Sequence, residues 1–149
     1  MTKKKQNLSA KLNKANPGPR VYFAHPMSTY GTFSEKLALK AIAKRFKGWK
    51  IINPSDEEIV GAVRVLYPLA GMDLFDVIVS KADAVVAMPF KDGLHGAGVF
   101  SELTAANRAR VPLYLISAFP DKAISELDYR SVVAASVNET RARINCKIQ

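Results

Sequence analysis

Cysteine, histidine and long apolar runs are scarce in this chain of 149 residues. The single cysteine, Cys146, excludes an internal disulfide. With only His25 and His95 beside it, a zinc site is not expected, and nothing in the sequence calls for another metal or a cofactor. No apolar run approaches the roughly 20 residues that span a bilayer, and no apolar core follows the basic amino terminus as in a secretory signal. We therefore expect a cytoplasmic protein with no membrane partner.

Positive charge dominates, because the chain has 22 lysines and arginines but only 13 acids, which gives a formal net charge of +9. Many of the lysines precede the Pro17-Gly18-Pro19 break, so residues 1–19 are predicted to be a flexible basic arm and residues 20–149 a single domain. A basic arm can bind nucleic-acid phosphates, but this one lacks aromatic residues for base stacking. A solvated tail is favoured over a nucleic-acid partner, and the positive field also suits an anionic nucleotide.

Short apolar runs alternate with amphipathic segments along most of the chain. The runs predict strands at 21–25, 49–53, 82–88 and 112–117, and the segments between them predict helices at 33–47, 70–81 and 99–109. A further helix is expected to open near Ser55, residues 121–127 suggest another, and residues 141–148 alternate like an edge strand. This order predicts an α/β fold, a Rossmann-like three-layer sandwich whose central parallel sheet has four to five strands.

Polar and glycine-rich segments follow three of the predicted strands. They begin at His25, Asn53 and Lys91. Ligands of open parallel sheets bind beyond the carboxyl ends of the strands, so these segments are the expected binding loops. His25 is either a general acid or base there, or a hydrogen-bonded residue at a strand end. The glycine-rich segment matches neither a P-loop nor GxGxxG, and no GxSxG is present.

Two acids stand near predicted helix starts. Glu102 follows the glycine-rich loop in HGAGVFSEL, where helix N–H groups and the helix dipole would keep a carboxylate ionised as a nucleophile requires. The alternative is that Glu102 only complements that dipole. Asp73 opens the helix predicted at 70–81 and is either a solvated first-turn acid or a second active-site carboxyl group. Glycosidic bond cleavage uses two such groups.

The segments VYFAHPMS, WKIINPSD, GMDLFDVIVSKADAVVAM and GAGVFSELTAANRARVPLYLI occur in this order within residues 20–117. Together they resemble the nucleoside 2-deoxyribosyltransferase superfamily, which includes nucleoside 5′-monophosphate N-glycosidases. The resemblance implies a flavodoxin-like sheet and a homo-oligomer of two or more subunits. It also implies a retaining mechanism, in which Glu102 attacks the anomeric carbon, Asp73 assists at the sugar, and water or a second base resolves the ribosyl ester.

The expected substrate is a nucleoside or nucleoside 5′-monophosphate, with hydrolysis of the monophosphate favoured because the chain is strongly positive. The chain departs from the family at His25, where glycine is frequent, and at Ala97 and Gly98, where a serine is frequent. A non-catalytic nucleotide-binding module and a nucleic-acid-binding protein that uses its basic arm remain as alternatives. The predicted substrate-binding residues are His25, Met27, Ser28, Tyr30, Asn53, Gly96, Gly98 and Ser117.

Overall fold

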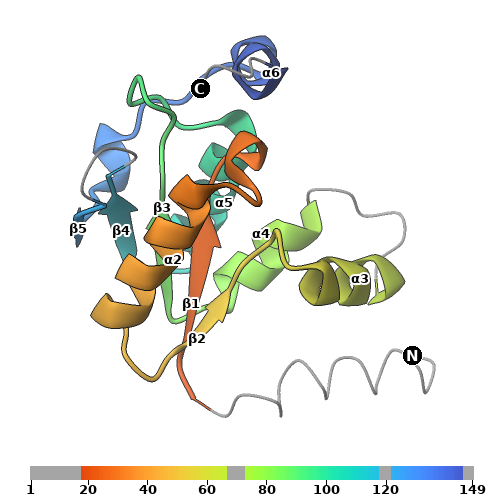
Figure 1. Cartoon of the computed structure of the whole chain (residues 1–149), viewed down its shortest axis with the longest axis vertical. Coiled ribbons are helices and arrows are strands. Elements are labelled where there is room, and N and C mark those ends of the chain that lie inside the picture. The colour runs from red at the N-terminus through yellow and green to blue at the C-terminus, as the bar shows by residue number, and fades with distance from the viewer. Residues whose placement is uncertain (1–17, 67–72, 118–121, 146–149) are drawn as a thin grey trace.

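The computed structural model describes residues 18–66, 73–117 and 122–145. It shows a mixed α/β fold in which a five-stranded sheet has the order β2-β1-β3-β4-β5 (Figure 1). The strands are β1 (Arg20–Ala24), β2 (Lys50–Ile52), β3 (Ala84–Ala87), β4 (Leu113–Ile116) and β5 (Ile124–Glu126). The helices are η1 (Met27–Thr29), α2 (Phe33–Arg45), α3 (Glu57–Leu66), α4 (Asp73–Ser80), α5 (Ala97–Arg108), η2 (Tyr129–Ser131) and α6 (Val137–Asn145). The predicted α/β class is confirmed, and the strand centres fall where the apolar runs predicted them.

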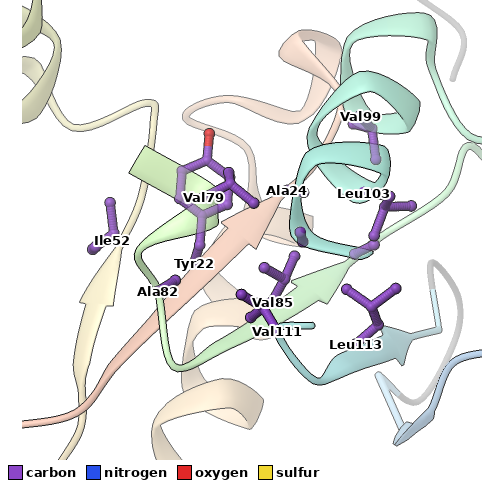
Figure 2. Packing of buried hydrophobic residues seen from close by; sticks show 12 residues of the cluster. Tyr22, Ala24, Ile52, Val79, Ala82, Val85, Val99, Leu103, Val111 and Leu113 are labelled. Carbon is purple, nitrogen blue, oxygen red and sulfur yellow. The ribbon is translucent and has the colours of Figure 1, made fainter. Parts of the chain in front are cut away.

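Strand β1 lies in the middle of the sheet, because it pairs in parallel with both β2 and β3. Its side chains alternate between two cores. Val21 and Phe23 pack with α2 on one face, whereas Tyr22 and Ala24 pack with residues of α4 and α5 on the other (Figure 2). Burial on both faces explains why the strand is apolar throughout instead of alternating.

Local signals set the ends of α2. Thr32 is the N-cap, and its hydroxyl accepts a hydrogen bond from the Glu35 backbone N–H at 3.3 Å. After the helix, Gly48 adopts a φ of +87°, which a residue with a side chain rarely adopts. The chain can therefore reverse directly into β2.

Two predictions for the carboxyl-terminal third are wrong. Residues 121–127 were expected to form a helix, but Ile124–Glu126 is the edge strand β5, which pairs antiparallel with β4. The connection between the two strands is too short for the crossover that a parallel pair requires. Four strands are therefore parallel and the fifth is not.

The edge strand predicted at 141–148 is instead part of helix α6, as far as Asn145. The helix begins at a reciprocal cap, because the Ser136 hydroxyl accepts from the Glu139 N–H and the Glu139 carboxylate accepts from the Ser136 N–H, both at 3.0 Å. This S-x-x-E capping box is a sequence signal for a helix start, and it outweighs the weak alternation that follows.

Most of the predicted basic arm, residues 1–17, and the sole cysteine lie outside the described residues. In the described part of the chain, no helix has both the length and the apolar character needed to cross a membrane.

Candidate active site

The carboxyl edge of the sheet gathers most of the predicted binding residues. His25 follows β1, Asn53 follows β2, Ser117 follows β4, and Gly96 is the N-cap of α5 after β3. These positions come from four segments of the chain and share one edge because the four strands run parallel. Of the residues in the first loop, Ser28 and Tyr30 are partly buried, whereas Met27 is 59% exposed.

Glu102 is buried in the interface between α5 and the sheet, with 5% of its surface exposed. It stands among Val99, Leu103 and Ala106, which are the core residues of the same helix. Its Oε2 atom has no hydrogen-bond partner. Burial raises the pKa of Glu102 to about 8, the nearby Tyr22 hydroxyl acts in the opposite direction, and the charge of Asp76 adds to the increase. The carboxyl group therefore holds its proton at neutral pH.

This protonation corrects the expectation that the helix dipole keeps Glu102 ionised. Helix α5 begins at Ala97, so Glu102 lies in its second turn, and no acid occupies the first turn. The effect of the dipole decays within that first turn. Desolvation is therefore the larger influence on Glu102.

The Tyr22 hydroxyl lies close to the Glu102 carboxyl group and is likewise buried without a hydrogen-bond partner. Figure 2 shows it pointing beyond the apolar side chains of the cluster. Burial raises the pKa of Tyr22 well above its ordinary value, and the Glu102 charge adds to this. Buried polar atoms are almost always paired in native proteins. Tyr22 and Glu102 act on each other's pKa, but neither the Tyr22 hydroxyl nor Glu102 Oε2 completes a hydrogen bond of good geometry, so both atoms keep the capacity to bond a ligand group.

A second acid near Glu102 is Asp76 on α4. Its Oδ2 atom accepts a hydrogen bond from the Ser101 hydroxyl at 2.9 Å, which joins α4 to α5 directly beside Glu102. Asp73, the acid predicted from the sequence, is the first residue of the same helix, and its side chain lies outside the described part. The structure therefore adds Asp76 as a carboxylate that the sequence prediction missed.

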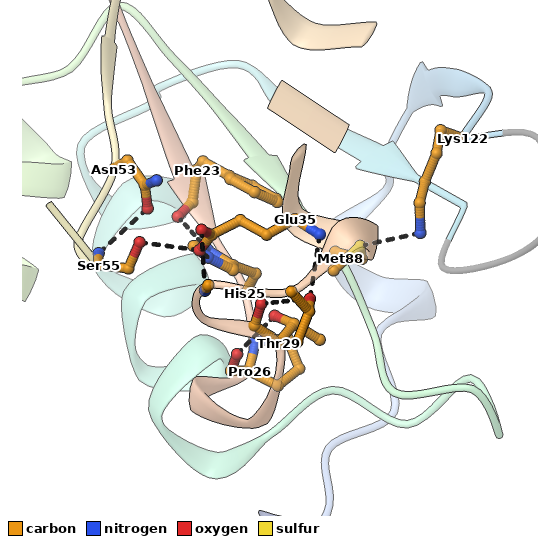
Figure 3. Close-up of polar contacts among 11 residues, drawn as sticks. Phe23, His25, Pro26, Thr29, Glu35, Asn53, Ser55, Met88 and Lys122 are labelled. Atoms are coloured by element: carbon orange, nitrogen blue, oxygen red, sulfur yellow. Dashed lines mark hydrogen bonds and ion pairs between the residues drawn. The ribbon is translucent and has the colours of Figure 1, made fainter. Parts of the chain in front are cut away.

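His25 belongs to a buried polar network on the other face of β1. Its Nε2 atom lies 2.7 Å from Glu35 Oε2, and its Nδ1 atom lies 3.0 Å from the Phe23 carbonyl (Figure 3). Glu35 also accepts from the Ser55 hydroxyl at 2.8 Å and from the Gly31 N–H at 3.1 Å. Because both ring nitrogens of His25 face protein acceptors, the structure agrees with the hydrogen-bonded alternative and leaves no ring nitrogen to act on a ligand.

Glu35 holds this network together as an anion. Burial would raise its pKa, but the hydrogen bonds from His25, Ser55 and Gly31 outweigh burial and keep the pKa below its ordinary value. The Asn53 side chain supports the same corner, since its Oδ1 atom accepts from the Ser55 N–H at 3.1 Å. Asn53 and His25 therefore support the carboxyl edge of the sheet through hydrogen bonds to other protein groups.

Tyr30 connects the two acidic groups. Its ring lies 4.8 Å from the His25 ring between centroids. Burial raises the pKa of Tyr30, and the charges of Glu102 and Glu35 act in the same direction. Tyr30 therefore lies near both the His25–Glu35 network and the Glu102 carboxyl group on α5.

The start of α5 is covered by the carboxyl-terminal segment. The Ala97 N–H donates to the Thr140 hydroxyl at 2.9 Å, and Arg143 binds Asp92 through Nε at 3.0 Å and Nη2 at 2.6 Å. A β-carbon at Gly96 would lie 3.4 Å from the Phe90 ring and 3.5 Å from the Thr140 methyl group, which is ordinary van der Waals contact, so the space around Gly96 does not require glycine. The left-handed glycine of this loop is Gly93, with a φ of +87°, and neither Gly96 nor Gly98.

Sequence reasoning did not identify Tyr22, Glu35, Ser55, Asp76 or Lys122. Lys122 is buried, and its ammonium group donates to the Ser34 hydroxyl at 2.7 Å near the end of β3. The available sequence signals were Glu35, an acid at the start of a predicted helix, and Tyr22, a lone tyrosine within an apolar run. Neither signal shows which other residue the side chain contacts.

Among the described residues, no three side chains of histidine, cysteine, aspartate or glutamate gather as metal ligands would. Comparisons of the chain with protein-family models, with curated proteins and with solved structures found no match. The resemblance to nucleoside deoxyribosyltransferases therefore stays a prediction.

The Tyr22→Phe substitution tests whether the Tyr22 hydroxyl stabilises the fold or contacts a ligand. Because the hydroxyl has no partner, its removal should change the free energy of unfolding by less than about 1 kcal/mol. It should also raise the pKa of Glu102, since the hydroxyl lowers it. Urea unfolding and the pH dependence of any activity measure the two effects. A loss of several kcal/mol would assign the hydroxyl to the core instead.

Proposed function

We propose that the chain cleaves the N-glycosidic bond of a nucleoside or nucleoside 5′-monophosphate, with Glu102 as the nucleophile. The observation that carries the proposal is the buried, unpartnered Glu102 carboxyl group beside the unpartnered Tyr22 hydroxyl, at the carboxyl edge of a parallel sheet. Enzymes characteristically shift the pKa of an acid at such a position. The strand order 2-1-3-4 is also that of flavodoxin-like sheets, which supports the family resemblance.

In the proposed reaction, an ionised Glu102 oxygen bonds to the anomeric carbon while the bond from that carbon to the base nitrogen breaks. The electron pair leaves with the base, which takes a proton. Water then adds to the anomeric carbon, the ester bond breaks, and the free sugar and the carboxyl group are restored. Asp76, together with the predicted Asp73, would supply the second acidic group on α4.

Since only the ionised carboxylate can attack, kcat/KM should rise about tenfold per pH unit below the Glu102 pKa of about 8 and level off above it. The test incubates the protein with nucleosides and their 5′-monophosphates between pH 5 and pH 9 and measures the free base released. Asp76→Asn should lower kcat roughly 100-fold, a typical size for loss of acid–base assistance. Ser101→Ala is the matched control, since it removes the same hydrogen bond but keeps the carboxylate.

A non-catalytic nucleotide-binding module is the second candidate, because a protonated Glu102 can donate a hydrogen bond to a ligand instead of attacking it. It predicts thermal stabilisation by one of the same nucleotides without release of base. If no member of the panel releases a base and none stabilises the protein, both functions are contradicted.

A further inference from the structure

We infer that the edge of the sheet opposite the candidate active site binds the phosphate backbone of nucleic acid. This edge carries the amino ends of the parallel strands and the ends of the helices that lead into them (Figure 1). The turns 18–20, 44–50, 81–83 and 108–112 meet there. We call their basic side chains the amino-edge face: Arg20, Lys44, Arg45, Lys47, Lys50, Lys81, Arg108 and Arg110.

Charge in the fold is distributed unevenly along the strand axis. Asp83 is the one acid in the four turns of the amino-edge face, and its carboxylate accepts the Arg20 backbone N–H at 2.8 Å. At the opposite edge, the acids Glu35, Asp56 and Asp92 stand among the basic residues Lys91, Lys122 and Arg143, so charges of both signs are mixed there. Positive charge with little acidic compensation is therefore found on the amino-edge face. A basic field with this distribution attracts a polyanion.

The residues of the face come from neighbouring strands and are held in register. Arg20 lies opposite Lys50 in the pairing of β1 with β2, and Val85 of β3 pairs with Leu113 of β4. Neighbouring strands lie about 4.8 Å apart, so four strands spread the basic turns over roughly 14 Å. Duplex DNA carries one charge per roughly 1.7 Å of its axis, so a face this wide meets several phosphates at once.

Arg110 occupies a position where its side chain is unfavourable for the fold. It follows α5 with a φ of +60°, and its N–H donates to the Asn107 carbonyl while the next N–H, that of Val111, donates to Ala106. Glycine is the usual residue at this point of a helix end, since a side chain there strains the backbone. An arginine at a glycine position is not explained by stability, but it does place a guanidinium group on the amino-edge face.

An open groove beside Arg110 favours nucleic acid over an anionic membrane. The groove is lined by Asn107, Arg110, Tyr129 and Arg130 above an apolar floor, and by Asp128, whose carboxylate pairs with Arg130 at 3.2 Å. An amide, an aromatic ring and guanidinium groups are the groups that contact bases and phosphates of single strands. The exposed large apolar side chains of the described residues, among them Met27 and Phe33, lie elsewhere, so the described part of the face offers lipid only the half-buried Trp49.

The test uses the full chain and a fluorescent 20-nucleotide single strand or duplex of mixed sequence, with binding followed by anisotropy. The face variant combines Lys47→Gln, Lys81→Gln and Arg110→Gly. The matched control combines Lys36→Gln, Lys91→Gln and Arg141→Gln, which removes the same charge from exposed positions outside the face. Thermal unfolding shows that both fold, and Arg110→Gly should not lower stability because it relieves the left-handed side chain.

We expect wild-type binding at 50 mM salt that weakens linearly with the logarithm of salt concentration. The face variant should bind at least tenfold more weakly with a salt slope smaller by about 2, while the control variant changes less than threefold. No wild-type binding, or equal losses in the two variants, would overturn the inference. Phosphatidylserine vesicles that bind as well as the oligonucleotides, with the same dependence on the face, would also overturn it by assigning the face to a membrane. The release of bases should continue in the face variant, so this result and the proposed function are tested separately.

Discussion

Glu102→Gln should abolish release of the base and at the same time make the protein more stable at alkaline pH. The substitution keeps the shape of the side chain but removes the carboxyl group that would attack. Loss of such a nucleophile costs on the order of 10⁴-fold or more in kcat. A residue kept only for the fold would show the opposite pattern, since its replacement lowers stability.

The stability effect follows from the raised pKa. Between the ordinary glutamate pKa of 4.5 and the folded pKa of about 8, the folded state holds a proton that the unfolded state has released. Stability therefore falls as pH rises through this interval and stays low above it. The penalty is on the order of 4–5 kcal/mol above pH 8 and is absent below about pH 4.

Urea unfolding of the wild type and Glu102→Gln at pH 5 and pH 9 measures this difference directly. The two proteins should have similar stability at pH 5, and the variant should be more stable at pH 9. A variant that is equally destabilised at both pH values would show that Glu102 is ionised and paired in the fold. Tyr22→Phe serves as a control that keeps the titrating group.

Glu35→Ala should be strongly destabilising. It removes three hydrogen bonds and leaves the buried His25 ring and the Ser55 hydroxyl without their acceptor. Breaking a buried pair of this kind costs roughly 3–5 kcal/mol. The expected decrease in Tm is on the order of 10 °C.

The same variant should lose the acid sensitivity that Glu35 contributes. Because the folded pKa of Glu35 lies below its ordinary value, its stabilisation is present above the unfolded pKa and is lost as pH falls through the folded pKa. The difference in stability between wild type and variant should thus shrink between neutral pH and about pH 3. Glu35→Gln, which keeps one acceptor oxygen in place of the two that Gly31 and Ser55 use, should lose less. A pH-independent difference would contradict an ionised Glu35.

The sequence predicts the strands well because each parallel strand is buried on both faces and reads as a short apolar run. It predicts β5 and α6 poorly for two different reasons. Ile124–Glu126 is a strand through its pairing with β4, which is a tertiary contact. Helix α6 has a capping box at Ser136 and Glu139, a local signal that the weak alternation after it obscured.

The candidate site shows the same limit. Glu102 was recognisable as an acid beyond a glycine-rich loop, and the structure places it there. Its protonation was not predictable, because it depends on burial against Tyr22 and on the charge of Asp76, which lie in distant parts of the sequence. For His25 the sequence left two roles open, a general acid or base and a hydrogen-bonded residue, and the bond from Nε2 to Glu35 favours the second.

Strand β1, which carries Tyr22, and helix α6, which covers the start of α5, are expected to differ in local stability. Strand β1 is bonded on both sides, so the amides of Tyr22 and Phe23 should exchange with deuterium only when the whole domain unfolds. Helix α6 is held by Thr140 on the Ala97 N–H and by Arg143 on Asp92, and its amides should exchange by local opening. Local opening of α6 would uncover the start of α5 while the strand that carries Tyr22 stays fixed.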